Sequence, residues 1–168
     1  MSFACGSRYG LAVVLSVAAA GAAAAAPGSA GWGQYRNNEA GVAFDFPRHI
    51  FAVDSAEQDR QGTVFKSPDG RARIRVFGVA NEARDTPARY LKRIARPDEA
   101  NFSYVRTTSR FFVASGTRDG MIFYRRCNFA GGSGQIGCLQ LDYPQGEKRA
   151  FDSVVTRISR SLRVVAAD

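Results

Sequence analysis

The chain has 168 residues, of which 45% are hydrophobic and 23% are charged, and its formal net charge is +8. This balance is typical of a folded globular protein and excludes a disordered, collagen-like or coiled-coil chain. One histidine and three cysteines are too few for a conventional His/Cys zinc, haem or iron–sulfur site. We therefore expect no metal and no other cofactor, and the composition by itself names no biochemical activity.

The first residues have the pattern of a secretory signal peptide. Arg8 precedes an apolar run that starts at Leu11 and continues into a series of alanines. Small residues before Pro27 suit signal peptidase, and the apolar run is short for a membrane span; a retained N-terminal anchor is the alternative. The sequence therefore predicts a signal peptide over 1–26, no transmembrane segment in the mature form, and a periplasmic or secreted location.

Two cysteines, Cys127 and Cys138, remain after the predicted leader. In an oxidising compartment an isolated pair of cysteines is expected to form a disulfide. The alternative, a reactive or metal-binding thiol pair, lacks the C-x-x-C spacing and a nearby histidine. We therefore predict a Cys127–Cys138 disulfide, which contributes roughly 3 kcal/mol in the chain-entropy model.

The first half of the remaining chain predicts strands followed by a helix. Alternating apolar residues predict strands at 42–46, 63–66 and 72–78. A Ser-Pro-Asp-Gly turn joins the last two strands into a hairpin. Thr86 is placed to cap a helix whose first residue is Pro87, and apolar residues at helical spacing continue until Pro97.

The second half predicts more strands and a closing helix. The strands are expected at 102–107, 111–115, 121–129 and 138–143, with a turn at 116–120. From Phe151 to Leu162, apolar residues recur at the three-and-four spacing of a helix. Short turns between neighbouring strands indicate an antiparallel β-sheet flanked by two main helices. We therefore predict a single α+β domain over 27–168, with its core at 32–163 and one disulfide.

Several motifs resemble small secreted bacterial proteins of the Mog1/PsbP-like class. They are Trp32-x-x-Tyr35-x-Asn37, Gly41-Val42-x-Phe44-x-Phe46-Pro47, Ser67-x-Asp69-Gly70, Phe112-Val113-x-Ser115-Gly116, Asp152-x-Val154-Val155 and Ser161-Leu162. The resemblance runs from Trp32 to Leu162 and implies an antiparallel α+β fold. It also implies a non-enzymatic binding or assembly role, since most members have one, but these roles are diverse and no ligand follows. No metal-binding side chain of photosynthetic relatives can be matched here.

Two motifs resemble catalytic or nucleotide-binding sites, but each also has a purely structural interpretation. The segment Gly132-Ser133-Gly134-Gln135-Ile136-Gly137 matches G-x-G-x-x-G, but it lies between two predicted strands and no helix signal follows. We expect a disulfide-closed hairpin loop there. His49 is the single histidine and has no triad partners, so we expect it on the surface.

Arginine dominates the basic residues, because only three of the 23 are lysines. Guanidinium groups bind phosphate and carboxylate through paired hydrogen bonds. The candidate anion-binding residues are Arg71, Arg73, Arg75, Arg89, Arg93, Arg125 and Arg126. Possible partners are an anionic lipid, lipopolysaccharide, a cell-wall polymer or an acidic protein; nucleic acid is not expected, since no recognition motif appears. The alternative is that the arginines are spread over the surface and paired with acids.

These features favour a non-enzymatic module that binds an anionic envelope component or an acidic protein. One alternative is a periplasmic hydrolase that uses dispersed Asp or Glu residues, and another is a structural subunit of an envelope assembly. Paired carboxylates can hydrolyse glycosides when folding brings them together. The acidic stretches are Asp54, Glu57 and Asp59, and the pair Asp98–Glu99. We expect them to be solvated loop charges and identify no catalytic residue.

Overall fold

The computed structural model describes Met1 and residues 31–58, 62–95, 102–131 and 134–165. The predicted signal peptide lies almost entirely outside this part. The strands are β1 (Trp32–Asn37), β2 (Val42–Pro47), β3 (Ala52–Gln58), β4 (Gly62–Lys66), β5 (Arg73–Ala80), β6 (Phe102–Thr107), β7 (Phe111–Arg118), β8 (Met121–Phe129), β9 (Gln135–Pro144) and β10 (Arg163–Val164). The helices are α1 (Pro87–Ile94), the short η2 (Gln145–Glu147) and α2 (Lys148–Ser161). No helix of the described part is long and apolar enough to cross a membrane.

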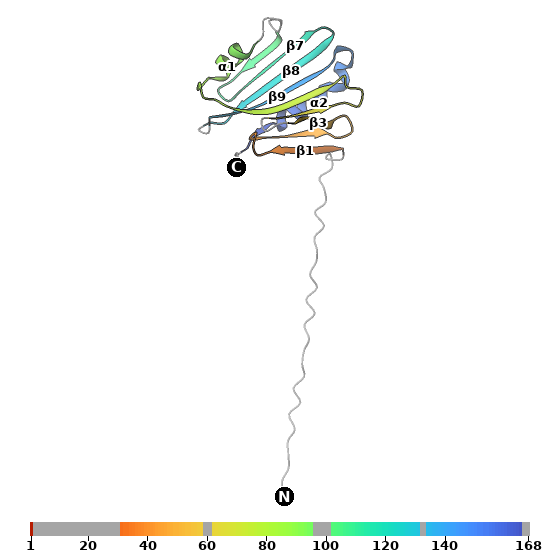
Figure 1. Cartoon of the computed structure of the whole chain (residues 1–168), viewed down its shortest axis with the longest axis vertical. Coiled ribbons are helices and arrows are strands. Elements are labelled where there is room, and N and C mark those ends of the chain that lie inside the picture. The colour runs from red at the N-terminus through yellow and green to blue at the C-terminus, as the bar shows by residue number, and fades with distance from the viewer. Residues whose placement is uncertain (2–30, 59–61, 96–101, 132–133, 166–168) are drawn as a thin grey trace.

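The strands form two antiparallel sheets. The large sheet has seven strands in the order β3-β4-β5-β9-β8-β7-β6, and the small sheet has the order β1-β2-β10 (Figure 1). Most neighbours in the large sheet are joined by short turns, whereas β5 pairs with β9, which lies far along the chain. The predicted antiparallel α+β fold with two main helices is confirmed.

Alternation along the strands gives the large sheet two distinct faces. Val76 lies opposite Leu139, and both belong to a core that includes residues of β2 and α2. The next pair, Phe77 and Cys138, faces the other way and packs with α1. Helix α2 and the small sheet therefore cover one face of the large sheet, and α1 covers part of the other.

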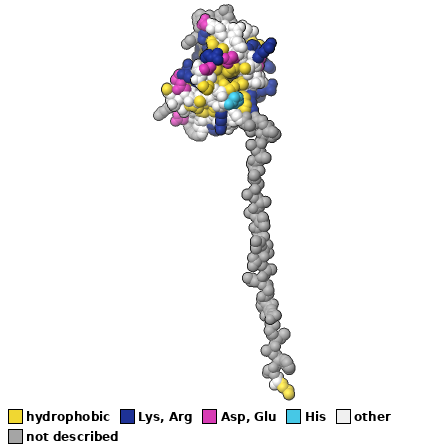
Figure 2. All heavy atoms as spheres, turned by 90° about the vertical axis from the view of Figure 1, so that its right-hand side faces the viewer, with side chains coloured by type: hydrophobic (Ala, Val, Ile, Leu, Met, Phe, Trp, Pro, Cys, Tyr) yellow, Lys and Arg dark blue, Asp and Glu magenta, His cyan; other side chains and the backbone are white. Residues whose placement is uncertain are grey.

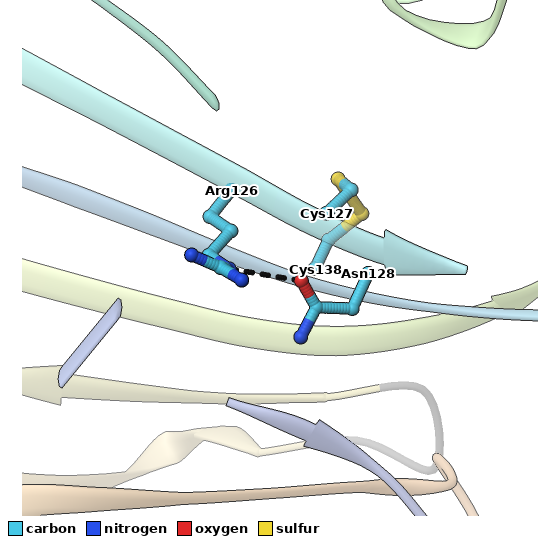
Figure 3. The surroundings of a disulfide bond; sticks show 4 residues. All are labelled: Arg126, Cys127, Asn128 and Cys138. Atoms are coloured by element: carbon cyan, nitrogen blue, oxygen red, sulfur yellow. Dashed lines mark hydrogen bonds between the residues drawn. A yellow bond between two sulfur atoms is a disulfide. The ribbon is translucent and has the colours of Figure 1, made fainter. Parts of the chain in front are cut away.

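The predicted disulfide is present between neighbouring strands. Cys127 of β8 lies directly opposite Cys138 of β9, and their sulfurs are bonded (Figure 3). Both residues are buried in the core beneath α1. Strand β8 ends at Phe129 and β9 begins at Gln135. The connection is therefore shorter than the predicted loop, because Gln135, Ile136 and Gly137 belong to β9 and pair with β5 and β8. The segment leads into a strand and lacks the helix that a dinucleotide-binding motif requires.

The predicted positions of one turn and one acidic stretch were wrong. Strand β7 continues to Arg118, so the predicted turn at 116–120 is wrong in its first half. The chain reverses at Asp119 and Gly120, which both have positive φ, the conformation that a tight hairpin turn requires. Asp54 and Glu57, which were expected to lie in a loop, belong to strand β3.

Candidate functional site

Four of the seven candidate arginines form ion pairs at the surface. Arg71 precedes β5 and lies 2.6 Å from Asp69 and 2.8 Å from Glu147. Arg73 pairs with Glu57. The two helix arginines share one carboxylate; their pairs are Arg89–Asp85 at 3.7 Å and Arg93–Asp85 at 2.8 Å. Figure 2 likewise shows basic and acidic side chains close together on the face that it draws. These four arginines therefore do not form a purely basic patch.

The acidic stretch of β3 serves the same kind of ion-pair network. Lys66 of β4 lies 2.8 Å from both Asp54 and Glu57. Its hydrogen bonds are the main cause that lowers the pKa of both carboxyl groups. These acids pair with a lysine of the neighbouring strand, so the expectation of a loop is wrong, although Glu57 is exposed to solvent as expected. Asp59 and the Asp98–Glu99 pair lie outside the described residues.

Arg125 and Arg126 are adjacent in β8, so their side chains point to opposite faces of the sheet. Arg126 donates a hydrogen bond to Asn128 Oδ1 of its own strand at 2.8 Å (Figure 3). It faces α2, where it donates another to Ser159 Oγ at 3.2 Å. Its guanidinium also lies 4.4 Å from the centre of the Phe111 ring. Arg126 therefore links α2 to strands β7 and β8.

Arg75 and Arg125 lie on the α1 face, where the strand register brings them together. Gln140 of β9 lies opposite Arg75 of β5 on one side and opposite Arg125 of β8 on the other. Arg118, at the end of β7, joins them around a hollow of about 360 Å³. We call this site the arginine hollow; its lining residues are Arg75, Phe77, Tyr90, Ile94, Arg118, Arg125, Gln140 and Asp142. The sequence missed Arg118 because the residue was assigned to a turn.

The arginine hollow lies beside the part of the sheet that α1 covers. Phe77, Tyr90 and Ile94 form its apolar wall, and the guanidinium of Arg75 lies 5.3 Å from the centre of the Phe77 ring. Burial raises the pKa of Tyr90, so its hydroxyl stays protonated at neutral pH. Three arginines and one carboxylate, that of Asp142, thus line the same hollow beside an apolar wall. This arrangement suits recognition of a carboxylate or phosphate group.

The other chemistry-bearing residues lie apart from this hollow. His49 is exposed in the turn after β2, as predicted. Within the described part of the chain, no three His, Cys, Asp or Glu side chains come together in a way that could hold a metal ion. The described lining of the hollow contains one carboxylate and no serine, cysteine or histidine. The hollow therefore offers charged and hydrogen-bonding side chains.

Comparison with known proteins identifies the fold. A scan of protein-family models gave no match, and neither did a search of curated protein sequences. Among solved structures, the chain is similar to cyanobacterial PsbP (CyanoP) from Synechocystis, with a TM-score of 0.57 and 11% identity over 85% of this chain and 98% of that one. It is also similar to the Ran-binding protein Mog1p of Saccharomyces cerevisiae, with a TM-score of 0.56 and 8% identity over 80% and 96% of the two chains. The chain has a Mog1/PsbP-like fold.

The arginine hollow is separate from the motifs that suggested the Mog1/PsbP-like fold. Those motifs fall mainly in β1, β2 and α2, which belong to the layers on the other side of the large sheet. None of their quoted residues lines the hollow. The motifs that suggested the fold therefore lie mainly on the side of the large sheet opposite the arginine hollow.

Proposed function

We propose that the protein is a periplasmic or secreted, non-enzymatic module that binds an anionic partner through the arginine hollow. The observation that carries this proposal is the convergence of Arg75, Arg118 and Arg125 from three strands around a single carboxylate. The partner is an anionic envelope component or an acidic protein, which presents phosphate or carboxylate groups. The N-terminal apolar leader supports the location.

The surroundings of the arginines strengthen their attraction for an anion. Arg118 and Arg125 are half-buried, so less water screens their charges than on an open surface. Gln140 lies between Arg75 and Arg125 and can add a neutral hydrogen bond. The apolar wall of Phe77 and Tyr90 excludes water from one side of the bound group. The hollow thus offers a charged and an apolar contact to the same ligand.

Charge reversal in the hollow tests this function. The binding of the purified protein to phosphatidylglycerol vesicles, lipopolysaccharide and a glutamate-rich peptide would be measured at low ionic strength. We expect at least one probe to bind, and Arg75→Glu with Arg125→Glu to weaken that binding by about tenfold or more, because two attractions become repulsions. Raising the salt concentration should weaken wild-type binding steeply.

Arg106→Glu combined with Arg36→Glu is the matched control, because it changes the net charge by the same amount; Arg36 is an exposed arginine of β1 that does not line the hollow. Like Arg75, Arg106 is an exposed strand arginine whose guanidinium lies near a phenylalanine ring, that of Phe111, at 5.8 Å. The strand register places it on the opposite face of the sheet. Equal affinities for the hollow variant and the control, or no binding of any probe, would refute the function. Hydrolysis of a glycan that Asp142→Asn abolishes would instead establish the hydrolase alternative.

A further inference from the structure

A second hollow, of about 670 Å³, lies on the other side of the molecule, between α2 and the small sheet. We call it the α2 groove; its lining residues are Asp45, Asp152, Ser153, Thr156, Arg157, Arg160, Ser161 and Arg163. Six of these residues belong to α2, one comes from β2 and one from β10. Segments that are far apart in sequence therefore meet there, and the α2 groove shares no residue with the arginine hollow.

Packing and hydrogen bonds fix the floor of the α2 groove. The buried Ser161 hydroxyl accepts a hydrogen bond from the Asp45 backbone N–H at 2.8 Å and donates one to the Ile158 carbonyl at 2.9 Å. This pair of bonds ties the end of α2 to β2. The spacing between the helix and the sheet is therefore set before any ligand arrives.

Three guanidinium groups line the α2 groove, each in a different setting. The guanidinium of Arg157 lies 4.2 Å from the centre of the Trp32 ring, which holds it against the small sheet. Arg163 Nη2 lies 3.6 Å from Asp45 Oδ1. Arg160 is exposed, and it has no acidic partner among the residues that the structure describes. Among the described residues, the groove thus contains one guanidinium, that of Arg160, with no carboxylate paired to it.

We propose that the α2 groove binds an acidic segment of a partner polypeptide. Most of the lining residues are exposed, so the groove is open and cannot enclose a small molecule as ligand pockets do. Asp45 and Asp152 also belong to the lining, and they would repel a uniformly anionic lipid surface. A polypeptide can place carboxylates at the arginines and neutral groups beside these aspartates.

This groove gives the protein a second contact surface, beyond the one that its proposed function uses. Helix α2 covers one face of the large sheet, and the arginine hollow opens on the other face. A partner seated on α2 would leave the hollow accessible. The protein can therefore hold an acidic polypeptide and a separate anionic ligand at the same time.

The test measures the binding of a fluorescently labelled peptide of alternating Glu and Ser, by anisotropy at low ionic strength. The protein carries Arg75→Glu and Arg125→Glu, so that the arginine hollow does not contribute. We expect this protein to bind the peptide, and the further change Arg160→Glu to weaken binding by about tenfold. Arg149→Glu is the matched control, since Arg149 is an exposed arginine of the same helix that does not line the groove.

Several outcomes would overturn the α2 groove as a peptide site. They are an absence of peptide binding, equal affinities for the Arg160→Glu and Arg149→Glu proteins, and phosphatidylglycerol vesicles that bind in an Arg160-dependent way when the peptide does not. Arg160→Gln removes the charge without reversing it and should weaken binding by a smaller factor, while circular dichroism verifies that each variant is folded. Failure here leaves the function of the arginine hollow intact, because that function is tested by different residues.

Discussion

At the scale of single residues, Asp69 shows how a short turn produces a shifted pKa. The Ser67 hydroxyl donates a hydrogen bond to its carboxylate at 2.6 Å, and the backbone N–H and guanidinium of Arg71 donate two more. These donors, with Ser67 first, lower the pKa of Asp69 from 3.8 to about 2. The ionised form therefore stabilises the folded state above the unfolded pKa, and this contribution is lost as the pH falls through the folded value.

We predict that Asp69→Asn lowers the free energy of unfolding at neutral pH, and that most of the difference from the wild type is lost as the pH falls from about 4 to about 2. Asparagine keeps the shape of the side chain and an acceptor oxygen, so the comparison isolates the charge. Urea unfolding at a series of pH values would measure the difference. A difference that stays constant between neutral pH and pH 2 would contradict the prediction.

At the scale of elements, helix α1 depends on its first residues. The Thr86 side chain accepts a hydrogen bond from the Arg89 backbone N–H, which would otherwise have no partner in the first turn. Tyr90 and Leu91 then pack over the disulfide-bonded part of the sheet. We predict that Thr86→Ala destabilises the protein by about 1 kcal/mol. The measurement is the urea-unfolding free energy, and Thr86→Ser should retain most of the stability; an alanine variant as stable as the wild type would exclude this cap.

The sequence predicted most strands, including the exposed β6, but it missed β1, β3 and β10. Apolar residues alternate along β2 and β5 because one face of each strand packs in the core. Strand β3 is almost entirely exposed, with an irregular register after Asp54, and its ion pairs with Lys66 and Arg73 attach it to the sheet. Such a strand has no periodic apolar signal. Strand β10 has two residues, which is too short for any pattern to reveal.

At the scale of the whole molecule, the candidate site could be located only from the pairing of the strands. The sequence identified Arg75 and Arg125 as anion-binding candidates, yet nothing local indicates that β9 lies between their strands. It also grouped Arg126 with Arg125, although alternation sends the two side chains to opposite faces. Other candidate arginines form ion pairs with acids that are distant in sequence, as Arg73 does with Glu57, and the sequence did not reveal these pairs. Local sequence patterns therefore predicted most strands of the sheet. The pairing of strands that are distant in sequence determines which arginines lie together.

The docking of the two sheets gives a prediction for the molecule as a whole. Gly78 of β5 lies against the backbone of Ala40, so a Cβ atom at this position would come within 1.6 Å of the Ala40 carbonyl oxygen. That carbonyl also accepts a hydrogen bond from the Gln135 side chain at 3.1 Å, which ties the β1–β2 turn to β9. Since backbone cannot rotate away as a side chain can, Gly78→Ala must push the small sheet from the large one.

We predict that Gly78→Ala lowers the free energy of unfolding by about 3 kcal/mol. Gly146→Ala is the matched control, because no atom lies within 4 Å of a Cβ added there, and we expect it to change stability by less than about 0.5 kcal/mol. Urea unfolding of both variants measures the difference. Because the arginine hollow is built on the large sheet and α1, the folded Gly78→Ala protein should still bind its anionic probe. Equal stabilities for the two variants would mean that the small sheet does not sit against Gly78.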